Sequence, residues 1–133
     1  MSTMKINIVT PDGPVVESEA DMIIAVTETG EMGILPGHIA TVAPLQIGAL
    51  RINKGNSTEV VAVHGGFIEV RPDVVTVLAQ SAETASTIDI ARAKLAASRA
   101  EEELKAKKDD ADFNLIELDL KRALNRISVF EGK

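Results

Sequence analysis

The sequence predicts an α+β protein, in which an N-terminal antiparallel β-sandwich over residues 1–84 is followed by a C-terminal two-helix antiparallel hairpin over residues 85–133. Three observations lead to this prediction. Short β-branched runs, separated by glycine and proline turns, fill the chain to about residue 80. Beyond residue 83, glycine is absent until Gly132, proline does not occur, and the residues that favour helices dominate. The length of 133 residues suits one domain, or one domain with a small appendage.

Four strands stand out in the first part of the chain. Residues 5–9 and 74–78 have the β-branched enrichment and partial alternation of strands buried on one face. Residues 22–26 and 60–63 are nearly continuous apolar runs, which are typical of strands inside a sandwich. We interpret residues 64–66, His-Gly-Gly, as a tight hairpin turn. No helical segment comes between the strands, so a Rossmann-type fold is excluded.

Two helices are expected after the strands. Ser86 is the expected N-cap of the first helix, because Asp89 follows three residues later as in a capping box, and this helix runs to about residue 106. The second helix spans about residues 109–130, with Asp109 or Asp110 as its cap. The connection between the helices is short and polar, which indicates a helical hairpin.

Each helix has faces that differ in character. In the first helix, Ala93, Ala97, Ala100 and Leu104 form a strip of mostly small residues that lets another helix approach closely. The second helix has one apolar stripe, which consists of Phe113, Ile116, Leu120, Leu124 and Ile127. A second apolar set lies almost opposite and consists of Leu115, Leu118 and Val129. One set packs on the first helix, and the other meets the sandwich, a partner protein or each in turn. A hairpin this small buries little apolar surface, so its detachment and redocking is a hypothesis.

Composition excludes several classes of function. The chain carries 14 Lys and Arg against 20 Asp and Glu, a net charge of −6, whereas a nucleic-acid binder needs a basic face. The absence of cysteine excludes disulfides, thiol chemistry and cysteine zinc sites. No apolar run approaches the roughly 20 residues that span a bilayer, which predicts a cytoplasmic protein that meets a membrane only through a partner.

Catalysis is difficult to build from this sequence. The two histidines, His38 and His64, lack metal-ligand spacing, so no metal site is predicted. No nucleophile elbow and no phosphate-binding P-loop are present. An enzyme with a Ser–His site near His64 is the alternative, and it requires an activity that is lost when this histidine is changed.

Arginines on both helices form a candidate anion site. They converge if the helices fold back on each other, and guanidinium groups bind phosphate oxygens in pairs. The alternative is that they pair with neighbouring carboxylates, and on the residues alone both interpretations stay open. The arginines are Arg92, Arg99, Arg122 and Arg126, and the carboxylates are Glu83, Asp89, Glu103 and Asp119.

Three segments make a family resemblance visible. Residues 30–38 (GEMGILPGH), 65–70 (GGFIEV) and 77–83 (VLAQSAE) resemble the epsilon subunit of bacterial F-type ATP synthase, most of all that of Bacillus-type bacteria. The resemblance covers essentially the whole chain in order, and three such motifs in register with a helical hairpin are specific. Met32 stands where leucine is commoner in the family, and His64 where serine is frequent.

The resemblance implies a ten-stranded sandwich followed by two helices, with no active site and no required cofactor. It further implies a subunit on the central rotor stalk that joins the gamma subunit to the membrane c-ring and couples proton transport to ATP synthesis. Such a protein is peripheral, on the cytoplasmic face of the bacterial cell membrane. Its hairpin packs on the sandwich when contracted, and when extended it reaches the alpha and beta subunits and inhibits ATP hydrolysis. A free-standing nucleotide-sensing module with the same architecture is the alternative.

The resemblance also implies roles for single residues. Residues 88–93, IDIARA, match the I/L-D-x-x-R-A motif with which some members bind ATP as a regulatory ligand. The arginines are assigned to the phosphates, Ile88 and Ala93 to an apolar wall, and Glu83 and Asp89 to the adenine amino or ribose hydroxyl groups. The implied ATP-binding residues are Glu83, Ile88, Asp89, Arg92, Ala93, Arg99, Arg122 and Arg126. Glu31 and His38, on one loop, are implied to face the c-ring, and Lys121, Arg122 and Arg126 to inhibit by meeting the beta subunits.

Overall fold

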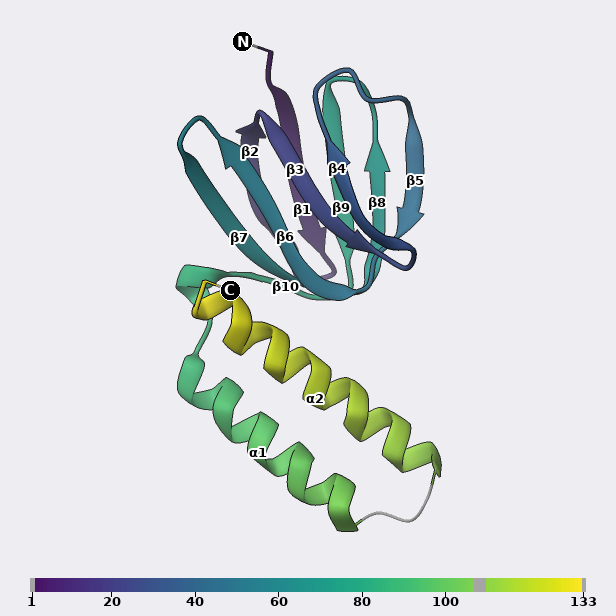
Figure 1. Cartoon of the computed structure of the whole chain (residues 1–133), viewed down its shortest axis with the longest axis vertical. Helices are drawn as coiled ribbons and strands as arrows, with labels where there is room; N and C mark the ends of the chain where they lie inside the picture. Colours follow the sequence, from purple (N-terminus) through teal and green to yellow (C-terminus); the bar gives the residue numbers. More distant parts are fainter. Residues whose placement is uncertain (1, 107–109, 133) are drawn as a thin grey trace.

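A computed structural model describes residues 2–106 and 110–132 of the chain, and within these ranges ten strands precede one 3-10 helix and two α-helices (Figure 1). The predicted fold class and the ten strands that the resemblance implies are both confirmed. The strands are β1 Met4–Thr10, β2 Gly13–Ala20, β3 Met22–Thr27, β4 Gly30–Ile34, β5 Thr41–Pro44, β6 Ile47–Lys54, β7 Ser57–His64, β8 Gly66–Val70, β9 Val74–Ala79 and β10 Ala82–Thr84.

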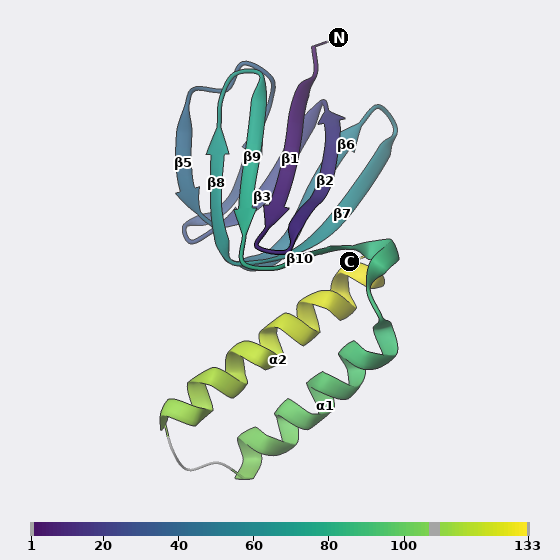
Figure 2. The same ribbon diagram turned by 180° about the vertical axis from the view of Figure 1, so that it is seen from behind.

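The strands form two five-stranded sheets packed face to face (Figures 1 and 2). The first sheet has the order β2-β1-β9-β8-β5, and the second has the order β10-β7-β6-β3-β4. Every pairing between these named strands is antiparallel except that of β1 with β9, where Ile6 lies opposite Val75 in a parallel register. This exception to the predicted antiparallel sandwich needs no crossover helix, because β1 and β9 are connected through the seven strands between them.

Alternating aliphatic side chains fill the space between the sheets. Ile6 and Ile8 of β1 meet Val75, Val77 and their neighbours in one cluster of buried residues. Residues 60–63 are apolar without alternation because both faces of β7 are covered there. Its inward side chains join the core between the sheets, and its outward side chains lie beneath a helix.

The turn after β7 crosses from one sheet to the other. β7 belongs to the second sheet and β8 to the first, so the interpretation of residues 64–66 as a hairpin turn is wrong. Gly66 has a φ of +111°, and a Cβ there would collide with the carbonyl oxygen of Leu78. The backbones of β8 and β9 therefore approach so closely that only glycine fits at this position.

The first α-helix begins later than expected. Ala85–Thr87 forms a 3-10 helix, η1, and α1 spans Ile90–Ala106. Asp89 caps α1, since its Oδ1 accepts a hydrogen bond of 3.1 Å from the backbone N–H of Arg92. The prediction that Ser86 is the cap is therefore wrong.

The second helix, α2, spans Asp110–Phe130 and returns antiparallel to α1 (Figures 1 and 2). The predicted cap at Asp109 or Asp110 lies outside the residues and side chains that the structure describes. The end of α1 at Ala106 and the end of α2 at Phe130 agree with the predicted bounds.

Small residues bring the two helices together. Ala93, Ala97 and Ala100 are buried, which confirms the predicted small-residue strip of α1. On α2 the buried positions near this strip are Ile116 and Ala123. The predicted stripe is wrong at Leu124, which is 47% exposed, and at Phe113, which is 38% exposed. Ile116 and Ala123 lie seven residues apart and so share one face of α2, and small side chains allow helix backbones to approach closely.

The hairpin meets the sandwich through the C-terminal half of α2. Val129 is buried against Ala62 of β7 and Ile88, in a cluster separate from the core between the sheets. Two polar contacts lie nearby, since Asn125 Nδ2 donates to the Gly48 carbonyl at 2.9 Å and Arg126 pairs with Glu83. Neither described helix is long and apolar enough to cross a membrane.

Candidate anion-binding site

A pocket of about 370 Å³ opens between the two helices of the hairpin. Arg99 of α1 and Arg122 and Arg126 of α2 line it, together with Glu103 and Asp119. The antiparallel arrangement of the helices brings these residues together from positions up to 27 apart in the sequence. A pocket of this size falls in the range of roughly 300–1,000 Å³ that is usual for small-molecule sites.

Two of these arginines already have carboxylate partners. Arg126 Nε donates to Glu83 Oε1 at 2.6 Å, and Arg122 Nη1 donates to Asp119 Oδ1 at 3.2 Å. Within residues 2–106 and 110–132, no ion pair of Arg99 is found. Both interpretations of the arginines thus describe part of the arrangement, since Arg122 and Arg126 pair with acids while all three line one pocket. Such partly exposed pairs contribute little stability, so a polyanion can compete with the carboxylates.

The remaining predicted ATP-binding residues lie outside this pocket. Arg92 is exposed and lies almost two helical turns from Arg99 on the same face of α1. Ile88 and Ala93 are buried in contacts of the protein itself, and Asp89 caps α1. The structure therefore brings together Arg99, Arg122, Arg126 and, through its ion pair, Glu83. It does not bring Ile88, Asp89, Arg92 or Ala93 into the lining of the same pocket.

A buried histidine beside this site was not predicted as part of it. His64, the last residue of β7, is 1% exposed and lies on the face of the second sheet that α2 covers. Burial lowers the pKa of His64 to about 4, and the guanidinium charges of Arg126 and Arg122 add to this effect. The sequence did contain a sign of this buried histidine, because His64 directly follows the apolar residues 60–63 and stands where the family frequently has serine.

A Ser–His pair does exist in the structure, between His64 Nδ1 and Ser81 Oγ at 3.0 Å. The imidazole is fully enclosed between β7 and the hairpin, so this pair does not face a substrate cavity. It is a partly buried polar contact within the fold, in which the histidine that would serve as the base is enclosed.

The residues implied to meet other subunits lie at separate places. Glu31 is in β4, and His38 is in the connection from β4 to β5, so they do not share a loop as expected. The ring of His38 is held by a contact of 2.7 Å between its Nδ1 and the carbonyl of Ile39. Lys121 is exposed and pairs with Glu117 at 3.6 Å, one turn away on α2.

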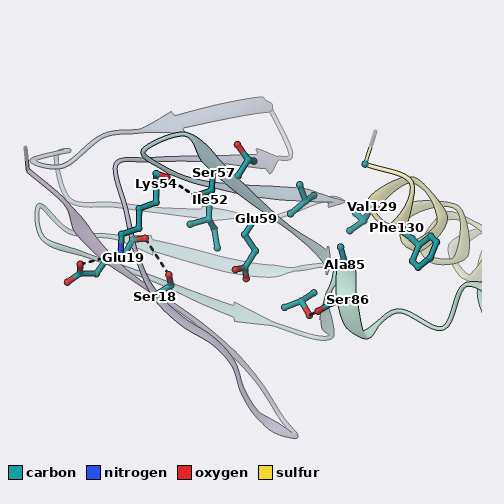
Figure 3. A pocket seen from close by; sticks show the side chains of 14 residues that line it. Ser18, Glu19, Ile52, Lys54, Ser57, Glu59, Ala85, Ser86, Val129 and Phe130 are labelled. Atoms are coloured by element: carbon teal, nitrogen blue, oxygen red, sulfur yellow. Dashed lines mark hydrogen bonds and ion pairs between the residues drawn. The ribbon is translucent and has the colours of Figure 1, made fainter.

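A larger hollow of about 610 Å³ lies where the end of α2 meets the sandwich (Figure 3). Its charged lining residues are Glu19, Lys54 and Glu59, and Lys54 lies 3.9 Å from Glu19. None of the predicted site residues lines it. Two carboxylates against one lysine do not favour a polyphosphate, so we place the candidate anion site at the arginine pocket.

Comparison with known proteins agrees with this architecture. Residues 3–85 match the family model described as ATP synthase, Delta/Epsilon chain, beta-sandwich domain, and residues 86–131 match the long alpha-helix domain of the same chain. An ATP synthase epsilon chain of Bacillus cytotoxicus is 59% identical over the full length of both chains. One of Bacillus subtilis is 58% identical, over 97% of this chain and 98% of that one.

Solved structures show the same fold. A chain in the mitochondrial ATP synthase of Euglena gracilis, in an assembly of OSCP, F1 and c-ring, superposes with a TM-score of 0.80 at 24% identity. The superposition covers 94% of this chain and 79% of that chain. At this level of identity the likeness concerns the fold alone.

A β-sandwich followed by long helices is the order of domains that the two family models describe. The two family models together cover nearly the whole chain, and the Bacillus relatives match it from end to end. The chain belongs to the ATP synthase epsilon chain family and is a non-catalytic subunit.

Proposed function

We propose that this subunit is a component of the central rotor stalk, which couples proton transport to ATP synthesis and regulates the enzyme through its hairpin. The docked hairpin seen here binds ATP as a regulatory ligand. The extended hairpin reaches the catalytic head and inhibits ATP hydrolysis. The subunit is peripheral, on the cytoplasmic face of the cell membrane, and meets the membrane only through the c-ring.

One observation carries this proposal, namely the convergence of Arg99, Arg122 and Arg126 on a pocket between the helices of the docked hairpin. A triphosphate there would bridge guanidinium groups of both helices through charge-assisted hydrogen bonds. It would bind the docked hairpin and not the extended one, because extension separates α1 from α2. By mass action, ATP then stabilises the docked state.

The docked, ATP-bound hairpin and the extended, inhibiting hairpin exclude each other because both use the same arginines. Arg122 and Arg126 lie on the face of α2 that meets the pocket and the sandwich, whereas Lys121 points to solvent. In an extended hairpin all three would be free to meet acidic surfaces of the beta subunits. Nucleotide and catalytic head then compete for one set of charges.

An apolar row on the first sheet supports a protein partner. Phe67 and Leu78, which are cross-strand neighbours, are 55% and 57% exposed on the outward face, and Val9 and Pro44 continue the row on either side. Exposed apolar surface of this kind is usually covered in an assembly. We assign this row to the gamma subunit, and the surfaces around Glu31 and His38 to the c-ring.

Calorimetric titration of the whole chain with ATP, and with GTP as a comparison, tests the nucleotide site. Arg122→Gln and Arg126→Gln each remove a charged donor, and we expect each to weaken ATP binding about 10- to 100-fold. Lys94→Gln, which removes an exposed positive charge from α1 outside the pocket, is the matched control and should leave the affinity within about twofold.

The same variants, reconstituted with the rest of the ATP synthase, test the regulatory role. Arg122→Gln and Arg126→Gln should relieve the inhibition of ATP hydrolysis together with the loss of ATP binding. Inhibition that survives both substitutions unchanged contradicts the sharing of these residues. Failure of the chain to co-purify with gamma subunit and c-ring would favour the free-standing nucleotide sensor instead.

A further inference from the structure

His64 lies in the contact between the sandwich and the hairpin. The outward face of the second sheet beneath α2 is formed by Ala62 and His64 of β7 together with Ala49 of β6. Val129 is the residue of α2 in the small buried apolar cluster of this contact, and the polar contacts of Asn125 and Arg126 with the sandwich lie beside it. A single titratable ring is therefore enclosed at the place where the hairpin docks.

The hydrogen bonds of this ring are incomplete. Nδ1 is paired with Ser81 Oγ, but Nε2 is buried and has no hydrogen-bond partner among the residues that the structure describes. In the neutral ring, one unpaired nitrogen is tolerated at a moderate cost. In the imidazolium both nitrogens carry protons, so a charged donor would be buried without an acceptor, which costs far more.

The charged groups that face His64 come from two elements. From α2 the guanidinium groups of Arg122 and Arg126 act on the ring, and from β10 the carboxylate of Glu83 lies on the same sheet face but is engaged by Arg126 at 2.6 Å. The neighbour of His64 on β6 is Ile47, and Arg51, the charged residue on that face of β6, lies further along opposite Val60. A proton on His64 thus meets two like charges, while the carboxylates of Asp119 and Glu83 are already paired with Arg122 and Arg126.

We propose that His64 is a proton-sensitive latch, which keeps the hairpin docked while the ring is neutral and releases α2 when the ring is protonated. The proposal rests on the proposed function in one respect, namely that the hairpin can leave the sandwich. Release exposes the ring to water and removes both arginines of α2 from it, so the released state binds the proton more readily.

The direction of the pH dependence follows from this difference. Burial and the two arginines lower the pKa of His64 to about 4 in the docked state, whereas an exposed histidine has a pKa of about 6.5. Docking is therefore unaffected by this residue above about pH 6.5 and weakens as the pH falls from there toward 4. Linkage gives a weakening of the docking equilibrium of about thirtyfold between pH 8 and pH 5.

Energy transfer between two dyes measures this equilibrium in the whole chain. The protein has no cysteine, so Asn56→Cys in the β6–β7 turn and Ser98→Cys on the exposed side of α1 give two unique labelling positions. With pH-insensitive dyes, the transfer efficiency should change between pH 8 and pH 5, while circular dichroism shows that the strands and helices persist. His64→Ser and His64→Asn, which cannot be protonated in this range, should abolish the change.

Two further variants separate the latch from the proposed function. Val129→Asp places a carboxylate in the buried contact and should release the hairpin at pH 8, independently of His64. If Val129→Asp remains docked, the hairpin does not leave the sandwich and the proposed regulation fails as well. If Val129→Asp is released but the pH response of the unmodified chain is absent, or persists in both His64 variants, the latch alone is refuted.

Titration of the imidazole itself provides the second measurement. In a His38→Gln background, the remaining histidine signal in the magnetic resonance spectrum belongs to His64. Its titration midpoint should lie below 6.5 and coincide with the midpoint of the energy-transfer change. If the imidazole of His64 titrates without any change in energy transfer, the latch proposal is refuted.

Discussion

The sandwich and the hairpin of this subunit are held together in different ways. The largest fully buried side chains, such as Met4, Ile23 and Ile68, all belong to the strands among the described residues. The helices instead approach each other through alanines, and they meet the sandwich through the small cluster around Val129. Because burial of aliphatic surface is the main stabilising contribution, one part is a stable platform and the other a separable attachment.

The largest effect that would test this comparison is expected at Gly66. Gly66→Ala forces a Cβ into the backbone of β9, at a position whose φ is +111°, and no side-chain rearrangement can relieve the collision. We expect a loss of at least about 3 kcal/mol in the free energy of unfolding, measured by urea denaturation followed by circular dichroism. Gly55→Ala, also at positive φ but with open space around the Cβ, is the matched control and should cost about 1–2 kcal/mol. Equal losses in both variants would contradict the close approach of β8 and β9.

A pair of truncations sharpens the comparison further. Ile68→Ala removes a fully buried side chain of the sandwich and should cost about 2–5 kcal/mol in global unfolding. Ile116→Ala removes a buried side chain between the helices, and should lower the hydrogen-exchange protection of α1 and α2 while leaving that of the strands unchanged. If Ile116→Ala also lowers the protection of β6 and β7, the hairpin and the sandwich unfold as one unit.

A smaller effect is expected at the start of α1. Asp89→Ala removes the cap and should cost about 1 kcal/mol, which the thermal unfolding of the helices reports. Asp89→Ser restores a capping oxygen without the carboxylate, so it should recover most of this loss. If Asp89→Ser binds ATP as tightly as the unchanged chain, Asp89 serves the helix and does not serve the nucleotide.

The smallest effect is expected at Lys121. Its ion pair with Glu117 is exposed, so Lys121→Gln should change the free energy of unfolding by less than about 0.5 kcal/mol. ATP affinity should also stay unchanged, because Lys121 does not line the arginine pocket. A reduced inhibition of ATP hydrolysis in the assembled enzyme, with stability and ATP affinity intact, would assign Lys121 to the extended state alone.

The sequence was sufficient for the fold class, because periodicity and turn residues are local properties. The alanine strip of α1 was predictable for the same reason, since it depends only on the repeat of the helix. The crossing at Gly66 and the parallel pairing of β1 with β9 were not predictable, because they depend on which strands share a sheet. That choice is made by packing among residues far apart in the chain.

The candidate site was predictable in part. Arg99, Arg122 and Arg126 converge as the antiparallel helices imply, whereas Arg92 lies further along α1 and does not line the pocket. Their partners Glu83 and Asp119 were among the carboxylates considered. The position of His64 beneath α2 could not be foreseen, because the docking face of the helix is set by Val129 and by the fit of Asn125 to the Gly48 carbonyl.

The parallel pairing of β1 with β9 has a consequence for synthesis of the chain. β1 can pair early with β2, but its other neighbour in the sheet, β9, is completed only at Ala79, so the first sheet closes late. Such distant pairing slows folding, because a long loop must close before the contact is formed. The helices follow this sheet in the chain and pair with each other through local contacts, so the hairpin can form against a sandwich that has already folded.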